Sequence, residues 1–175
     1  AAQPGIVRAT AIDLLARYPG AAADDAIRHA LRDPDPQVRH AAAGAQQAAS
    51  PEHIAQALTP LLGDPTRAVR MEAARVMAGA GALPAPTSMA AFDAAIAEFE
   101  SAQRENLDRP EAWLNLGNLA GWRGDAAGAE DAYRRALGRD PRFVPAAINL
   151  ADLYRATGRE ADAEQVLRDA LQAAT

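Results

Sequence analysis

Two fixed repeat lengths, one in each half of the chain, constrain this sequence more than any other feature. In the first half, a Val-Arg pair recurs every 31 residues, together with an alanine four positions after the valine. These positions are Val7-Arg8, Val38-Arg39 and Val69-Arg70, with Ala11, Ala42 and Ala73. Repeats of this length are small helical units that bury their apolar faces only by stacking on their neighbours. The period therefore predicts a stack of units with two helices each.

An Asp-Pro pair closes the units of the first half, at Asp33-Pro34 and at Asp64-Pro65. An Asp side chain can cap a helix by accepting a hydrogen bond from a free backbone N–H, and Pro fits the first helical position. The sequence therefore predicts that these aspartates cap the helices that follow them. Ser50-Pro51 predicts another helix start by the same reasoning.

The second half repeats every 34 residues. In the first copy, residues 110–141, the carrying residues are Trp113, Leu116, Gly117, Ala129, Tyr133, Ala136 and Pro141. The second copy, residues 144–175, has Ala147 in place of Trp113 and Tyr154 in place of Ala120. Large and small residues are thus exchanged between the copies, which keeps the volume of the core comparable. The small residues are expected to let paired helices cross closely.

The composition favours helix throughout. Alanine, the best helix former, makes up 47 of the 175 residues, and no alternating run of β-branched residues indicates a sheet. We therefore expect an all-α fold, an αα-superhelix (helical-repeat solenoid) of about ten helices in five antiparallel pairs. The expected helices lie near 5–18, 22–32, 36–49, 51–62, 66–79, 88–106, 110–122, 126–138, 144–156 and 160–173.

The two repeat types divide the chain. Residues 1–80 carry the 31-residue units, residues 81–87 form a connection rich in Gly, Ala and Pro, and residues 88–175 carry the 34-residue pattern. Helix 88–106 has the pattern of a second helix without a first helix of its own type. Helix 66–79 lacks a second helix. The simplest interpretation is that these two helices pair, which makes the chain one continuous solenoid.

Both halves resemble known repeat families. The first resembles HEAT repeats of the short bacterial form, through residues 33–39 and 64–70 and a weaker copy at 4–8. The second resembles tetratricopeptide repeats, through its Trp-x2-Leu-Gly run and the alanines, aromatic and proline that follow. The HEAT resemblance implies a structural polar ladder between neighbouring units, and a ligand-binding arginine row is the alternative. The ladder residues would be Asp33, Asp64, Arg8, Arg39 and Arg70.

The tetratricopeptide resemblance implies a concave groove lined by the first helix of each repeat. Asn115 and Asn149 occupy the same repeat position, and this resembles an asparagine ladder that contacts peptide backbones, since an amide both donates and accepts hydrogen bonds. The alternative is that these asparagines bond to neighbouring helices or water. Trp122 is either an exposed anchor or a filler beside Ala120. The candidate groove residues are Asn115, Asn118, Asn149, Asp152, Leu114, Ile148, Arg155 and Trp122.

Several functional classes lack their chemistry in this sequence. All 18 basic residues are arginine and cysteine is absent, while His29, His40 and His53 have no metal-ligand spacing. Nucleophile and phosphate-binding motifs are absent, so no catalytic residues, metal or cofactor are expected, and the protein is predicted not to be an enzyme. The net charge of −5 arises entirely within residues 88–175, which argues against nucleic-acid binding. No apolar run is long enough for a membrane span.

The sequence therefore predicts a protein–protein interaction scaffold that binds a peptide or partner protein in its groove. The alternative is a structural docking arm of a larger bacterial redox protein, because the chain is similar to the repeat region of multihaem cytochrome c-associated tetratricopeptide proteins. That resemblance implies a periplasmic location. The chain starts at Ala1 without a signal-peptide pattern, so we expect a piece of a longer protein. Leu167 and Leu171 lie at an uncapped C-terminal end, where further repeats or self-association are expected.

Overall fold

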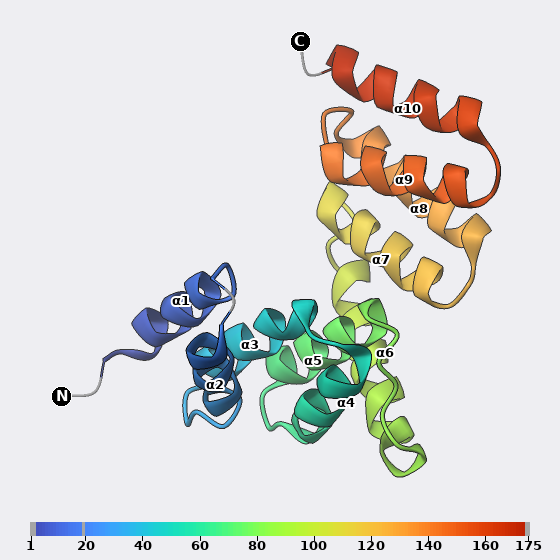
Figure 1. Ribbon diagram of the computed structural model, residues 1–175. Coiled ribbons are helices and arrows are strands. Elements are labelled where there is room, and N and C mark those ends of the chain that lie inside the picture. The colour runs from blue at the N-terminus through green and yellow to red at the C-terminus, as the bar shows by residue number, and fades with distance from the viewer. Residues whose placement is uncertain (1–2, 19, 174–175) are drawn as a thin grey trace. The chain divides into compact units, whose positions relative to one another are not determined.

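The computed structural model describes residues 3–18 and 20–173, and every regular element in these ranges is a helix (Figure 1). The last position of the second 34-residue copy, Thr175, lies outside them. The α-helices are α1 (Gly5–Leu15), α2 (Ala21–Ala30), α3 (Pro36–Gly44), α4 (Pro51–Leu58), α5 (Arg67–Gly79), α6 (Met89–Arg104), α7 (Pro110–Trp122), α8 (Ala126–Arg139), α9 (Val144–Ala156) and α10 (Glu160–Ala173). Short 3₁₀ helices are η1 (Ala45–Ala48), η2 (Thr59–Gly63) and η3 (Pro86–Ser88). The predicted all-α helical-repeat fold is confirmed.

The chain divides into two compact units, residues 1–99 and 100–175, and the division falls inside α6. The connection predicted at 81–87 lies within the first unit. It opens with Gly81 in a left-handed turn, at φ +64°. The pairing of helices that would make the two repeat types one continuous solenoid stays a prediction.

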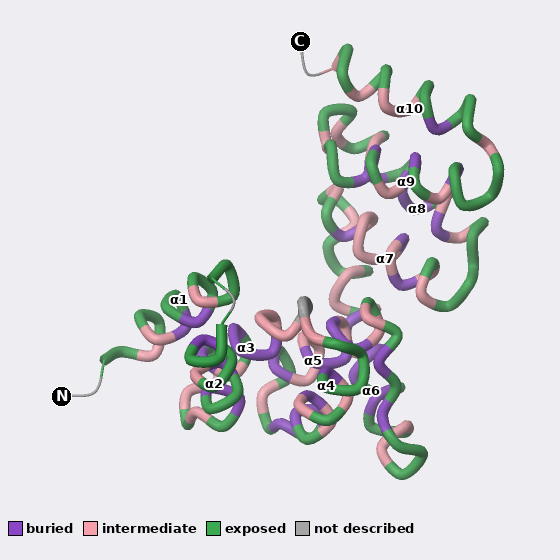
Figure 2. Tube along the Cα trace, viewed as in Figure 1, coloured by how far each residue is buried: buried purple, intermediate pink, exposed green. Residues whose placement is uncertain are grey.

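In the first unit, the helices that begin each repeat contact one another in succession, α1 with α3 and α3 with α5. The recurring residues Val38, Ala42, Val69 and Ala73 are all buried (Figure 2). The 31-residue period therefore arises because each repeat places the same small apolar residues against its neighbours.

The predicted polar ladder joins the same helices. The guanidinium of Arg8 lies 2.7 Å from the carboxylate of Asp33, and that of Arg39 lies 2.7 Å from Asp64. Each ion pair links an arginine of one repeat to the aspartate that starts the next. The arginine row is therefore engaged within the protein, in the structural role that the resemblance implied.

The expectation that Asp33 and Asp64 cap the following helices is wrong. Helix α3 is capped by Asp35, whose carboxylate accepts the N–H of Gln37 at 2.9 Å, and α5 follows Thr66 without a side-chain cap. Asp33 and Asp64 instead each accept the N–H two residues ahead, both at 2.8 Å. This tight turn, characteristic of Asp, aims each carboxylate back at the ladder arginine.

In the second unit, small residues allow the paired helices to approach closely, as predicted. A Cβ atom added to Gly117 on α7 would lie 2.4 Å from the Tyr133 ring of α8. The buried core consists of Ala129, Tyr133, Leu150, Ala151, Tyr154 and Ala163. The predicted exchange of residue size is visible, because Tyr154 fills the core of the second copy and Ala147 is buried beside it.

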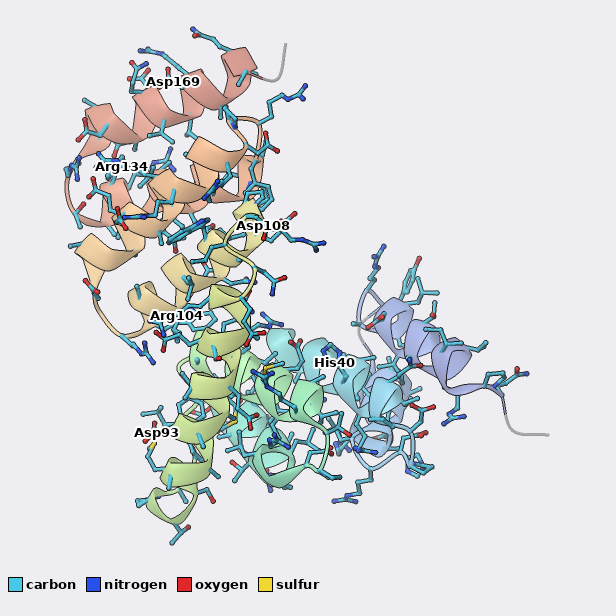
Figure 3. The ribbon with its side chains drawn as sticks, turned by 180° about the vertical axis from the view of Figure 1, so that it is seen from behind. His40, Asp93, Arg104, Asp108, Arg134 and Asp169 are labelled. Atoms are coloured by element: carbon cyan, nitrogen blue, oxygen red, sulfur yellow. The ribbon has the colours of Figure 1, made fainter. Side chains whose placement is uncertain are left out.

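Tight turns join the helices of each pair in the second unit. Gly124 and Gly158 have φ values of +76° and +75°, in the left-handed region that only glycine adopts without strain. The carboxylate of Asp125 then caps α8 by accepting the N–H of Gly128 at 2.9 Å. Ion pairs within single helices cover the surface, such as Arg104 with Glu100 at 2.6 Å (Figure 3).

Candidate functional site

The candidate groove residues lie on α7 and α9, the first helices of the two 34-residue copies, and three polar side chains meet there. The Nδ2 atom of Asn149 on α9 donates a hydrogen bond to Oδ1 of Asn118 on α7 at 2.7 Å. The Tyr133 hydroxyl of α8 donates to the same oxygen at 2.9 Å. These three residues, the amide cluster, connect the two copies through one shared acceptor.

Asn115 lies in a similar arrangement one turn before Asn118. Its Nδ2 atom donates to Oε1 of Gln103 at 2.9 Å, at the end of α6. Both asparagines of the predicted ladder therefore bond to neighbouring helices, which is the alternative role that the sequence left open. The peptide-binding role stays a proposal, because hydrogen bonds within the protein do not exclude a ligand at the other amide atoms.

Each asparagine of the amide cluster keeps one amide atom available. Within residues 3–18 and 20–173, neither Nδ2 of Asn118 nor Oδ1 of Asn149 has a hydrogen-bond partner. No buried side-chain nitrogen or oxygen in these ranges lacks a partner, so the two atoms must reach solvent. A free donor and a free acceptor therefore lie side by side on neighbouring helices.

Burial reinforces the amide cluster from below. The Tyr133 side chain is buried, and this burial raises the pKa of its hydroxyl against a smaller opposing effect of the hydrogen bond with Asn149. The hydroxyl is therefore a proton donor at neutral pH and holds the orientation of Asn118. Sequence comparison of the repeats did not identify Tyr133 or Gln103 as partners of the asparagines, because both were assigned to other helices and only the folded chain brings them together.

The other candidate residues differ in what they offer a ligand. Ile148 leaves 46% of its surface exposed, next to Asn149. Asp152 and Arg155 are exposed and form a 3.0 Å ion pair one turn further along α9. Leu114 packs against the core of the second unit, so its role is structural. Trp122 is half-buried at the C-terminal end of α7, between the two roles considered for it.

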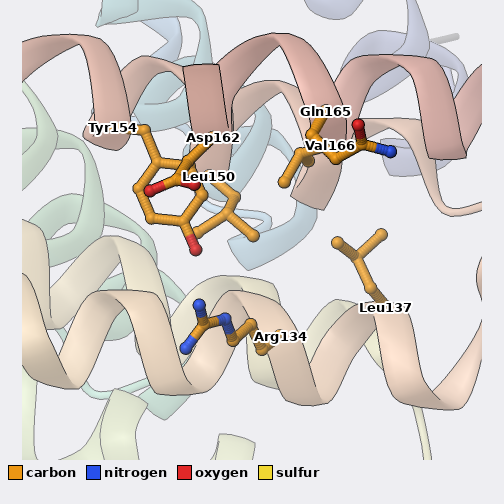
Figure 4. A pocket seen from close by; sticks show the side chains of 7 residues that line it. All are labelled: Arg134, Leu137, Leu150, Tyr154, Asp162, Gln165 and Val166. Atoms are coloured by element: carbon orange, nitrogen blue, oxygen red, sulfur yellow. The ribbon is translucent and has the colours of Figure 1, made fainter. Parts of the chain in front are cut away.

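Two open cavities lie in the second unit, away from most of the candidate residues. The first, of about 290 Å³, is lined by Arg134, Leu137, Leu150, Tyr154, Asp162, Gln165 and Val166 of α8, α9 and α10 (Figure 4). The second, of about 310 Å³, is lined by Arg155, Glu160, Glu164, Leu167, Arg168 and Leu171. Arg155 alone belongs both to a cavity and to the candidate groove, so a ligand on the amide cluster would bind an open surface.

Among residues 3–18 and 20–173, no cluster of three or more His, Cys, Asp or Glu side chains is placed to hold a metal ion. His53, one of the three histidines, instead accepts or donates through Nδ1 to the Ser50 hydroxyl at 2.9 Å, at the start of α4. None of the helices in the same described ranges is long and apolar enough to cross a membrane.

Stacked helix pairs joined by a polar ladder, followed by pairs with closely crossing helices, define a helical-repeat protein. Residues 1–78 match the family model of HEAT repeats. Residues 90–141 and 123–175 match two family models of the tetratricopeptide repeat. The chain therefore carries HEAT repeats followed by tetratricopeptide repeats. No curated protein matches it. Repeats of these two kinds present extended binding surfaces and typically serve as scaffolds.

Proposed function

We propose that this protein is an interaction scaffold that holds an extended peptide segment of a partner protein along α7 and α9. Both repeat families support a scaffold role in general. The peptide groove is our more specific proposal, and it concerns the surface formed by Asn115, Asn118, Ile148, Asn149 and Asp152.

The observation that carries the proposal is the pair of free amide atoms in the amide cluster. An extended peptide presents N–H and C=O groups alternately, and one residue of it can donate to Oδ1 of Asn149 while a carbonyl accepts from Nδ2 of Asn118. Because Asn118 is already held by Tyr133, and Asn149 by Asn118, the two amides lose little freedom when a peptide binds.

Side chains beside the amides would supply the sequence preference. Ile148 offers an exposed apolar contact, and Asp152 and Arg155 offer one charge of each sign. We therefore expect a bound peptide to place an apolar side chain near Ile148 and a charged or polar side chain about one turn of α9 away. Backbone contacts alone would give weak affinity without such contacts.

The experiment uses the full chain and a displayed library of random unstructured peptides. The affinity of a selected peptide is measured by titration calorimetry for the wild type and for Asn115→Ala with Asn149→Ala. Loss of two hydrogen bonds of about 1 kcal/mol each corresponds to roughly 30-fold weaker binding. Asn106→Ala is the matched control, because Asn106 is an exposed asparagine at the end of α6 that bonds to the Ala102 carbonyl. Unchanged affinity in the double variant would refute the groove.

The alternative function, a docking arm in a larger bacterial redox protein, is favoured by the apolar C-terminal end. Leu171 on α10 leaves 70% of its surface exposed, and Leu167 is only partly buried against the core. In this alternative, further repeats or a partner domain cover both leucines. Haem-binding motifs in the same polypeptide upstream of residue 1 would support it, whereas a monodisperse longer protein in which neither leucine is protected from solvent would contradict it.

A further inference from the structure

Helix α1 carries an exposed apolar stripe that nothing in the proposed function uses. The α1 stripe consists of Val7, Ala11, Leu14 and Tyr18, at intervals of four, three and four residues, so the four side chains share one face of the helix and of the turn that follows it. Val7, Leu14 and Tyr18 expose 49%, 50% and 73% of their surface. Large apolar residues exposed together mark a contact surface more often than scattered ones.

The same stripe is buried in the repeats that follow. Val38 and Val69, the counterparts of Val7, expose 1% and 0%, and Ala42 and Ala73, the counterparts of Ala11, expose 0%. Helix α3 has a first helix on each side, since it contacts α1 and α5, whereas α1 contacts α3 alone among the first helices. We infer that the stripe is a helix-packing surface whose neighbour is missing at this end of the array.

The residue pattern argues against a further repeat of the same kind as that neighbour. In the ladder, Asp33 receives the guanidinium of Arg8, and Asp64 receives that of Arg39. The position 31 residues before Asp33 is Ala2, whose methyl group cannot accept a hydrogen bond. A preceding repeat of this type would leave its ladder arginine without an acceptor at the new interface.

The α1 stripe is also larger than its counterparts. Leu14 stands where the second repeat has Ala45, and Tyr18 stands where the second and third repeats have Ala49 and Ala80. A helix packed as closely as α1 is on α3 would meet these larger side chains. No charged residue lies within the stripe, so the stripe can face an identical copy of itself without like-charge repulsion.

We propose that two copies of this chain pair through the α1 stripe, with α1 of one protomer against α1 of the other. The arrangement is a two-fold one, in which each stripe covers its partner's. Four side chains cover well under the roughly 800 Å² per partner of a standard protein interface. The pairing is therefore weak, with a dissociation constant on the order of 10–100 µM.

Analytical ultracentrifugation of the full chain between 1 and 500 µM tests the proposal. The wild type is expected to shift from monomer to dimer across this range, and Leu14→Glu is expected to remain monomeric at 500 µM. Leu171→Glu is the matched control at the other end of the chain, where the exposed fraction is 70%. A wild type that stays monomeric at 500 µM overturns the proposal. So does a dimer that survives Leu14→Glu, or one that only Leu171→Glu dissolves.

A second measurement does not depend on the stability of the glutamate variant. The chain contains no cysteine, so a single Ala11→Cys variant places one thiol on the α1 stripe. A short bismaleimide is expected to link this variant into dimers at 100 µM. Ala127→Cys, at an exposed position on α8, serves as the control and is expected to give only background linking. Equal yields from the two variants would contradict pairing through α1.

Discussion

Removal of the Asp64 carboxylate is predicted to be the most damaging single change in the polar ladder. Asp64 accepts Nε and Nη2 of Arg39 at 2.7 and 3.0 Å and the N–H of Thr66 at 2.8 Å. The side chains of Asp64 and Arg39 expose only 5% and 12% of their surface. Asp64→Ala leaves a guanidinium with little access to water and without its partner, and breaking such a pair costs about 3 kcal/mol.

The other two rungs of the ladder provide an internal scale. Asp33 and Arg8 expose 18% and 31% of their side chains, and Glu98 and its partner Arg70 expose 32% and 24%. Water can compensate these charges more readily, so Asp33→Ala and Glu98→Ala are expected to destabilise less than Asp64→Ala. The predicted order follows the burial of each pair.

Urea unfolding followed by far-UV circular dichroism measures the loss. With a slope of about 1.5 kcal/mol per molar urea, a loss of about 3 kcal/mol lowers the midpoint for Asp64→Ala by about 2 M. Arg39→Ala combined with Asp64→Ala should cost less than the sum of the two single changes, because each removes the same interaction. Additive losses, or a smaller loss for Asp64→Ala than for Glu98→Ala, would refute the reasoning from burial.

Three further predictions concern pH, packing and the joining of the two repeat types. Burial alone would raise the pKa of Asp64, but the hydrogen bonds from Arg39 and from a backbone N–H outweigh it and lower the pKa below its ordinary value of 3.8. The stability from this ion pair is therefore complete above about pH 4 and is lost as the pH falls through the folded-state pKa, so thermal melts between pH 5 and 2 should fall more steeply for the wild type than for Asp64→Asn. Gly117→Ala should cost about 2 kcal/mol in chemical unfolding because its Cβ would overlap the Tyr133 ring, whereas Gly138→Ala, with open space at the same point of α8, should raise the melting temperature. Both tryptophans lie in the second unit, so if α6 serves both repeat types, as we propose, Asp64→Ala should lower the urea midpoint of tryptophan fluorescence along with that of circular dichroism, and an unchanged fluorescence midpoint would show independent units.

The local features of the fold were predictable because they depend on short-range patterns. The expected helices 110–122, 144–156 and 160–173 have the bounds observed for α7, α9 and α10. Turn glycines, small residues at crossing points and the 31-residue period each have a local physical cause. Two ladder rungs were predictable for the same reason, since the Asp and Arg positions repeat with the period.

Contacts that depart from the period could not be predicted in this way. One period after Asp64 the sequence has Ala95, so Arg70 has no aspartate to pair with. The observed partner, Glu98, lies about one turn further along α6 and bonds to Arg70 at 2.6 Å. The meeting of Asn118 with Asn149 likewise depends on how α7 and α9 are offset in the folded unit. Side-chain reach and helix offset are tertiary properties that the repeat positions alone do not define.

The most direct test of the proposed scaffold is to locate a bound peptide on the protein. A selected peptide that carries a photoreactive benzoyl group is irradiated in complex with the full chain, and the linked residues are identified by mass spectrometry. We predict links to α7 and α9 around the amide cluster, near Ile148 and Asn149. Links confined to α8 and α10, around the cavity lined by Leu137 and Val166, would contradict the groove and place binding on that cavity instead.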